Sequence, residues 1–136
     1  MPAWFGNAPL SIGLLPLRLV LGLVFVMHGY QKVFVWGMSG TAGAFESMGV
    51  PLPQLTSALI AVVELAGGLM LILGFSVEWA ALGLAADMLG AILMVKLGGG
   101  FFAPRGVELE LALLGGLLTL LLLGSGKRGA ARERVS

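Results

Sequence analysis

The sequence predicts an all-α integral membrane protein, an up-down bundle of four transmembrane helices. Of the 136 residues, 58% are hydrophobic and only 11% are charged, and the mean hydropathy is +1.01. Soluble domains carry about 25% charged residues, so this chain could not cover a surface facing water. The apolar residues form four stretches, each near the roughly 20 residues needed to cross a bilayer. These stretches are residues 10–34, 55–74, 77–97 and 107–123.

The first two stretches are bounded by helix-breaking residues. The first starts near Ser11 and ends before Gly37, and Pro16 falls in its first turns. A membrane helix tolerates such a proline when its neighbours satisfy the freed carbonyl. Pro51 and Pro53 precede the second stretch. Each stretch is therefore predicted to form one helix.

The third and fourth stretches follow after short breaks. Residues 74–76 separate the second stretch from the third, and residues 98–104, with three glycines and a proline, precede the fourth. The fourth ends at residues 124–126. Short connections favour sequential antiparallel helices, hence the up-down bundle.

The longer connection between the first two stretches predicts an additional short helix. Ala42, Phe45 and Met48 recur at every third residue within 39–50. This spacing favours a helix lying on the outer surface of the membrane.

We expect a single transmembrane domain over residues 1–126 and a basic cytoplasmic tail over 127–136. The tail contains Lys127, Arg128, Arg132 and Arg134. Basic residues next to a membrane helix mark the cytoplasmic side, so we interpret the tail as a topology signal rather than a nucleic-acid contact. An even number of spans then places the N-terminus in the cytoplasm as well, in the plasma (inner) membrane. No Lys or Arg precedes residue 11, so we expect no removable signal peptide.

Three ionisable residues fall deep within the predicted spans: Arg18, Glu64 and Asp87. A charge at the bilayer centre costs about 2.5–3.5 kcal/mol or more unless it is paired, protonated or used. At about 1.5 Å per residue, all three lie roughly 12–15 Å from the inner surface. We therefore predict a structural ion-pair layer in which Arg18 contacts both carboxylates. The alternative is a proton relay, because one guanidinium facing two carboxylates leaves a surplus negative charge.

A second polar layer is predicted nearer the outer side. His28 and Lys32 are four residues apart and share a helix face. Phe25 and Arg18 continue the same face at heptad spacing. Two glutamates start the fourth stretch, at positions 108 and 110, and point about 200° apart, so at most one readily faces the interior.

Several kinds of site are not predicted. The chain has no cysteine, which excludes disulfides and thiolate ligands. His28 is the only histidine, without the spacing of a metal site, so no metal and no covalently bound cofactor is expected. No nucleotide-binding motif occurs.

Five segments together resemble the DoxX family of small four-helix membrane proteins. They read RLVLG from residue 18, FVMHGYQK from 25, FESMGVP from 45, ELAGGLMLILG from 64 and GFFAPRGVE from 100. The resemblance covers about residues 15–126. One departure is the tail after Gly126, where many relatives have a Ser-Leu-Asp-like ending.

The resemblance implies a function. The family's glutamate after the Phe-Phe-x-Pro loop falls on Glu108, which resolves the choice between the two glutamates. Name-giving members resemble subunits of a quinone-linked oxidoreductase, so any enzymatic role would be of that kind. We then expect Glu64, Glu108 and His28 as catalytic residues carrying protons, with Lys32, Phe25 and Arg18 binding a quinone or a small anionic substrate.

The expected partners are the lipid bilayer and a protein that supplies electrons, or further copies of this chain. Two other functions remain open at this point. One is a non-catalytic assembly subunit, whose buried charges only set helix register. The other is a small proton-coupled transporter, which a chain of this length would form only as an oligomer.

Overall fold

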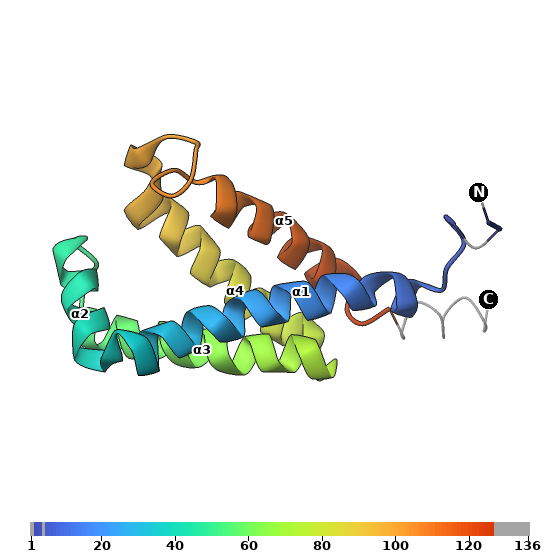
Figure 1. The fold of residues 1–136 in the computed structure, drawn as a ribbon, viewed down its shortest axis with the longest axis horizontal. Coiled ribbons are helices and arrows are strands. Elements are labelled where there is room, and N and C mark those ends of the chain that lie inside the picture. The colour runs from blue at the N-terminus through green and yellow to red at the C-terminus, as the bar shows by residue number, and fades with distance from the viewer. Residues whose placement is uncertain (1, 4, 127–136) are drawn as a thin grey trace.

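The computed structural model describes residues 2–3 and 5–126, and the helices dominate this part of the chain (Figure 1). The α-helices are α1 Leu10–Tyr30, α2 Gly37–Ser47, α3 Pro53–Leu73, α4 Val77–Ala91 and α5 Glu108–Leu123. A π-helical turn, Gln31–Val35, extends α1. Another, Ile92–Lys96, extends α4 and leads into the short 3-10 turn Leu97–Gly99. No strand occurs in the described residues.

The all-α membrane class is confirmed, but the four-span bundle is confirmed only in part. In the described chain three helical segments are long and apolar enough to cross a membrane: Leu10–Val35, Pro53–Leu73 and Val77–Gly99. Helix α5 has 16 residues, fewer than the roughly 20 that span a hydrocarbon core. The short helix expected within 39–50 is present as α2. The basic tail lies outside the described residues.

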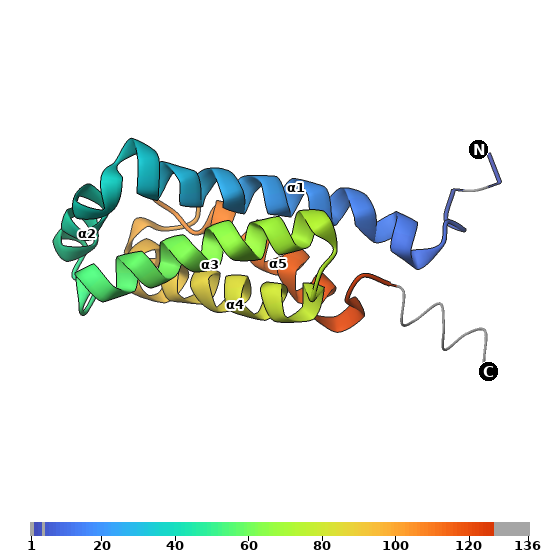
Figure 2. The same cartoon turned by 90° about the horizontal axis from the view of Figure 1, so that it is seen from below.

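The helices are arranged as two pairs. Helix α1 lies antiparallel beside α3, and α4 lies antiparallel beside α5, with α3 joining the pairs through its contacts with α4 (Figures 1 and 2). The pairs diverge toward the end that carries α2 and the α4–α5 connection. The first described residues and the end of α5 lie at the opposite end.

Glycines bring α1 and α3 into close contact. A Cβ on Gly22 would lie 2.6 Å from the carbonyl oxygen of Gly68, and a Cβ on Gly68 would lie 2.7 Å from that of Gly22. Further along, a Cβ on Gly29 would lie 2.6 Å from Cγ of Leu65. Small residues allow helix backbones to approach closely in membranes. These contacts set the register of the two helices.

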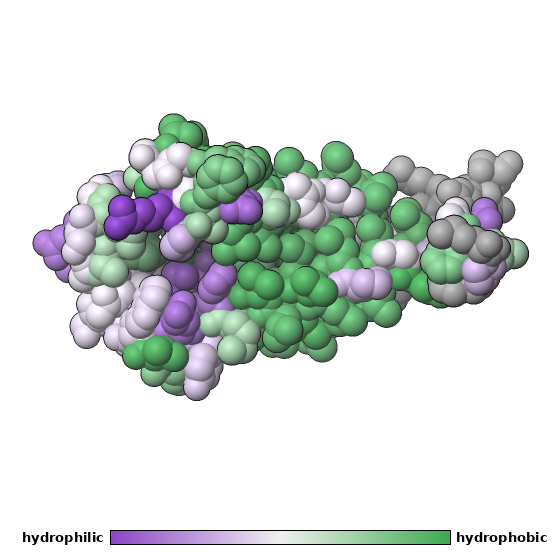
Figure 3. Space-filling model, turned by 45° about the horizontal axis from the view of Figure 1, so that its top comes forward, coloured by the Kyte–Doolittle hydropathy of each residue, from purple (hydrophilic) through white to green (hydrophobic). Residues whose placement is uncertain are grey.

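The core is apolar and lies where the pairs meet. Its largest fully buried side chains include Phe25, Leu71, Leu84 and Leu117. Many large apolar side chains on the outer faces are exposed, and an apolar surface covers the middle of the molecule (Figure 3). An exposed surface of this kind suits contact with lipid.

The Gly22–Gly68 contact generates a stability prediction. We expect Gly68→Ala to lower the free energy of unfolding in detergent by about 1–3 kcal/mol, because the new methyl overlaps backbone atoms of α1. Gly115→Ala is the matched control, since a Cβ there meets nothing within 4 Å. Thermal unfolding of the two variants measures the difference. Equal stabilities would contradict the proposed close contact.

A candidate polar site between the helix pairs

The two π-helical turns each carry a lysine of the polar interior. Lys32 lies in the first turn and Lys96 ends the second. A π turn changes the helix register, and such turns are frequent at functional sites. The carbonyl oxygen of Lys32 accepts a hydrogen bond from Thr41 Oγ1 of α2 at 2.8 Å. Thr41 is completely buried, so α2 helps to hold this turn in place.

Lys32 forms an ion pair with Glu64 across the α1–α3 interface. Lys32 Nζ lies 2.7 Å from Glu64 Oε1, and the side chains are 13% and 4% exposed. The carboxylate is therefore almost fully removed from solvent, while its ammonium partner keeps some access. A carboxylate buried this deeply stays charged only beside such a partner.

Asp87 of α4 completes the group, which we call the triad of Lys32, Glu64 and Asp87. Its carboxyl group interacts electrostatically with the Glu64 carboxyl group and the Lys32 ammonium. Asp87 is 9% exposed, and its Oδ2 is buried with no hydrogen-bond partner in the described structure. Two carboxyl groups face one ammonium here. A proton bound by one of the two carboxyl groups would remove the surplus negative charge and supply the donor for a hydrogen bond between them.

The predicted ion-pair layer is wrong in one member, because Arg18 lies elsewhere. Its Nε donates a hydrogen bond to the carbonyl oxygen of Leu71 at 3.0 Å. Its guanidinium lies against Gly74, where a Cβ would be 2.6 Å from Nη2. Arg18 therefore serves the C-terminal end of α3, whose last carbonyls lack helical partners and favour a cation.

The error has a clear geometric origin. Depths counted from the ends of the apolar stretches assume that all helices begin at one level. The Gly22–Gly68 contact instead sets Arg18 opposite Gly74. The first two turns of α1, before Arg18, therefore extend past the C-terminal end of α3. Lys32 takes the place that was predicted for Arg18.

The expectation that Glu108 faces the interior is also wrong. Glu108 is exposed, and its Oε2 accepts a hydrogen bond from the backbone N–H of Ala103 at 2.8 Å. This hydrogen bond stabilises the loop before α5. Of the two glutamates at the start of α5, Glu110 is the buried one, and its Oε1 lies 3.5 Å from Lys96 Nζ. Lys96 Nζ also donates to the carbonyl oxygen of Pro104, so this pair ties the loop to α4 and α5.

Sequence reasoning missed the pairing of Lys96 with Glu110. A signal was present, since a lysine ends one apolar stretch and a glutamate begins the next. Antiparallel neighbours bring such ends together. The sequence contained no such signal for the hydrogen bond between the Ala103 N–H and Glu108, which depends on the conformation of the loop.

The remaining predicted residues have different surroundings. His28 is half-buried one turn before Lys32, and no hydrogen bond to its imidazole occurs within the described residues. Phe25 is 0% exposed and belongs to the hydrophobic core, so its ring has no surface to offer a ligand. Of the six predicted site residues, the structure thus brings together Lys32 and Glu64, with Asp87 from the predicted ion-pair layer.

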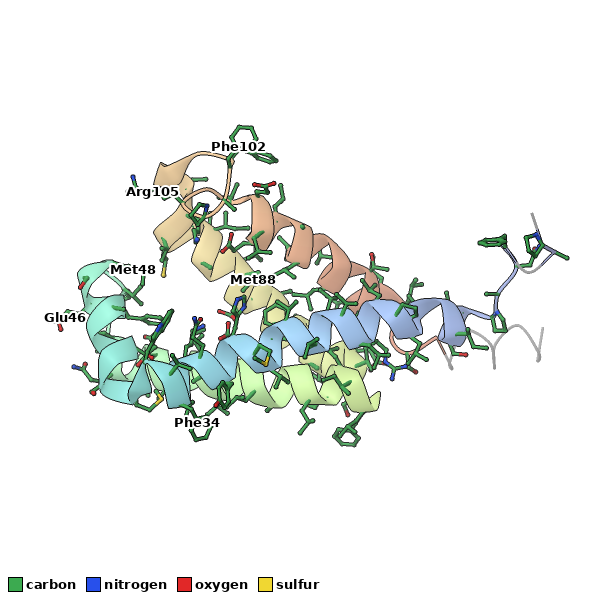
Figure 4. The ribbon with its side chains drawn as sticks, in the orientation of Figure 1. Phe34, Glu46, Met48, Met88, Phe102 and Arg105 are labelled. Atoms are coloured by element: carbon green, nitrogen blue, oxygen red, sulfur yellow. The ribbon has the colours of Figure 1, made fainter. Side chains whose placement is uncertain are left out.

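The surface around this region is polar and hollowed. Hydrophilic residues gather at the end where the helix pairs diverge, and some lie at the bottom of a hollow (Figure 3). Glu46 and Met48 of the α2 segment lie on one side of this end, and Phe102 and Arg105 of the α4–α5 loop lie on the other (Figure 4). Among the described residues, no cluster of three acidic or imidazole side chains could hold a metal ion.

Comparison with known proteins identifies the family. A family model described as DoxX matches residues 13–97. The chain belongs to the DoxX family.

Three DoxX relatives align with most of the chain. It is 36% identical over 122 residues to "Uncharacterized membrane protein Rv3486" of Mycobacterium tuberculosis, covering 82% of this chain and 74% of that protein. It is 35% identical over 119 residues to "Putative oxidoreductase CatD" of Bacillus subtilis, covering 88% and 84%. An "Uncharacterized protein" of Haemophilus influenzae is 34% identical over 119 residues, covering 86% and 85%. No solved structure matches the chain.

The ion-pair geometry predicts a pattern of energetic coupling. In a double-mutant cycle of Lys32→Met and Glu64→Gln, we expect a coupling energy of about 0.5–3 kcal/mol, because the charges lie in direct contact. The cycle of Arg18→Met and Glu64→Gln should be additive within about 0.5 kcal/mol. Denaturation of the single and double variants in detergent measures both values. Strong coupling of Arg18 but not of Lys32 would contradict the structure.

Proposed function

We propose that this DoxX protein is a small subunit of a quinone-linked oxidoreductase system, in which the triad of Lys32, Glu64 and Asp87 binds the head group. The observation that carries the proposal is that two buried carboxyl groups, Glu64 and Asp87, lie with one partly accessible ammonium, Lys32, inside an apolar helix bundle. Intramembrane ionisable groups with unmet hydrogen-bonding capacity mark a functional site. The name of the Bacillus subtilis relative supports an oxidoreductase role.

The residues present fit a quinone. Its carbonyl oxygens need hydrogen-bond donors, and Lys32 has N–H groups beyond the one directed at Glu64. His28, one turn away on α1 and without a partner in the described structure, is a second donor. A bound quinone supplies a two-electron acceptor that takes up protons when it is reduced.

The chain's own residues have separate tasks in this proposal. Lys32 orients Glu64 and donates to the ligand. Glu64 and Asp87 hold a proton between them and pass it to the ligand oxygen. The apolar surroundings exclude water and strengthen each of these interactions. Glu108 has no role in proton transfer in this proposal, because it is exposed and accepts a hydrogen bond from the backbone of the loop.

Electron supply requires a partner in this proposal. The sequence contains no cysteine, so no dithiol of this chain carries electrons. We propose a membrane-associated protein partner that docks at the polar end or, alternatively, a reductant that binds directly.

The membrane arrangement is part of the proposal. Helix α5 acts as a short fourth span beside α4, in the plasma (inner) membrane, with both termini cytoplasmic and the polar end facing outward. Because the chain lacks cysteine, Ser47→Cys in α2 and Asn7→Cys near the N-terminus permit labelling from outside intact cells, and we expect only Ser47→Cys to react. Labelling of Asn7→Cys alone would reverse the orientation.

Quinone binding by the purified protein tests the function. We expect decylubiquinone to bind the wild type in detergent, and Lys32→Met to weaken binding by about 1.5–3 kcal/mol, since a charge-assisted hydrogen bond is lost. Titration of intrinsic fluorescence measures both affinities. Arg18→Met is the matched control, because Arg18 lies away from the triad, and it should bind normally.

A specific pair of results would contradict the proposal. If neither the wild type alone nor its native complex binds quinone, and Glu64→Gln leaves quinol turnover in membranes unchanged, the oxidoreductase role is wrong. The buried charges would then only fix the register of the helices, as in a non-catalytic assembly subunit.

A further inference from the structure

Arg18 is a buried cation that no acidic side chain neutralises within the described residues. The residue is 7% exposed, and it takes part in no ion pair of the described structure. Its hydrogen bond there runs from Nε to the carbonyl oxygen of Leu71. A guanidinium carries further N–H donors on Nη1 and Nη2, and these are left for other acceptors.

The C-terminal end of α3 compensates the charge of Arg18 only in part. Nε lies at Leu71 and Nη2 lies at Gly74, so the side chain runs along α3 toward its last residues. The unpaired carbonyl groups at a helix C-terminus act as about −0.5 elementary charge, against the full positive charge of a guanidinium. Removing a charge from water is costly unless a counter-ion and hydrogen-bonding partners replace the water. An anion beside Nη1 and Nη2 would supply both.

A hollow of about 660 Å³ lies at the same end of the molecule. It is lined by residues 74–79 together with Leu82, Leu121 and Ser125. Its volume falls within the range of small-molecule sites, about 300–1,000 Å³. Gly74 belongs both to the lining of this hollow and to the contact with Arg18. The hollow therefore offers space for a ligand next to the guanidinium.

The lining of the hollow suits the head group of a phospholipid. Trp79 is 73% exposed, and tryptophan is enriched where a membrane meets water, at the level of the lipid head groups. A guanidinium binds phosphate oxygens through paired hydrogen bonds. The carboxylate of Glu78 lies in the same lining and suits an ammonium group better than a second anion. A zwitterionic head group carries both charges.

We propose that Arg18 binds the phosphate group of a zwitterionic phospholipid, with Nη1 and Nη2 donating to its oxygens beside the α3–α4 turn. The phosphate supplies the counter-charge that the described acidic residues do not. Leu82 and Leu121 of the hollow contact the start of the acyl chains. This site is separate from the triad, and it does not depend on the proposed function.

The test compares three probes on the purified full chain in detergent. They are dioctanoylphosphatidylethanolamine, dioctanoylglycerol, which has the same chains without the phosphate, and inorganic phosphate. The ligand-dependent rise in the temperature of thermal unfolding measures each affinity. We expect the phospholipid to bind about tenfold or more tightly than either other probe, since only it combines the phosphate with the chains. Its zero net charge limits unspecific attraction to the basic residues that follow residue 126.

Variants assign the binding to Arg18. Arg18→Met should weaken phospholipid binding about tenfold or more, because charge-assisted hydrogen bonds are lost. Arg18→Lys should bind with intermediate affinity, because it keeps the charge but not the paired donors. Arg105→Met is the matched control and should bind as the wild type does. Arg105 is an exposed arginine in the α4–α5 loop, at the opposite end of the molecule (Figure 4).

Three results would overturn the proposal. The first is equal binding of the phospholipid and dioctanoylglycerol by the wild type, and the second is undiminished phospholipid binding in folded Arg18→Met. The third is binding of inorganic phosphate as tight as that of the phospholipid, which would assign the site to a free phosphate. The comparison of probes on the wild type is decisive by itself, even if Arg18→Met does not fold.

Discussion

The ion pair between Lys32 and Glu64 is the interaction on which the polar interior depends. It joins α1 to α3 within an apolar bundle, and neither charge could remain there alone without a penalty of several kcal/mol. The pair forms because glycines set the register of the two helices and a π turn, held by Thr41, presents the lysine. Asp87 then extends the pair to α4, so one group of charges links three helices.

The polar residues divide into three groups with separate surroundings. Arg18 serves the C-terminal end of α3, and the pair of Lys96 and Glu110 fastens the loop between α4 and α5. Structural contacts explain the position of both these groups. The triad differs because it places two buried carboxyl groups beside one ammonium, whereas Lys96 meets a single carboxyl group. That difference is why the quinone is assigned to the triad and not to the other two groups.

The sequence predicted the helices well, because their length and hydrophobicity are local properties that Gly and Pro interrupt. It also identified Glu64, Asp87 and Lys32 as unusual, since each is a charge within an apolar stretch. The sequence did not predict which of the charged residues form ion pairs with one another. Which lysine or arginine meets Glu64 depends on the offset between α1 and α3, and that offset arises from the contact of Gly22 with Gly68. The role of Glu108 depended on a loop conformation that no periodicity encodes.

The central claim is that Glu64 and Asp87 share a proton beside Lys32, and infrared spectroscopy tests it most directly. Asp87 is the only aspartate in the chain, so protein labelled with [4-¹³C]aspartate reports on this residue alone. At neutral pH we expect a protonated-carboxyl band that shifts with the label and is lost in Asp87→Asn. Glu110→Gln should retain it. A wild-type spectrum without any protonated-carboxyl band, showing both groups ionised, would contradict the shared proton.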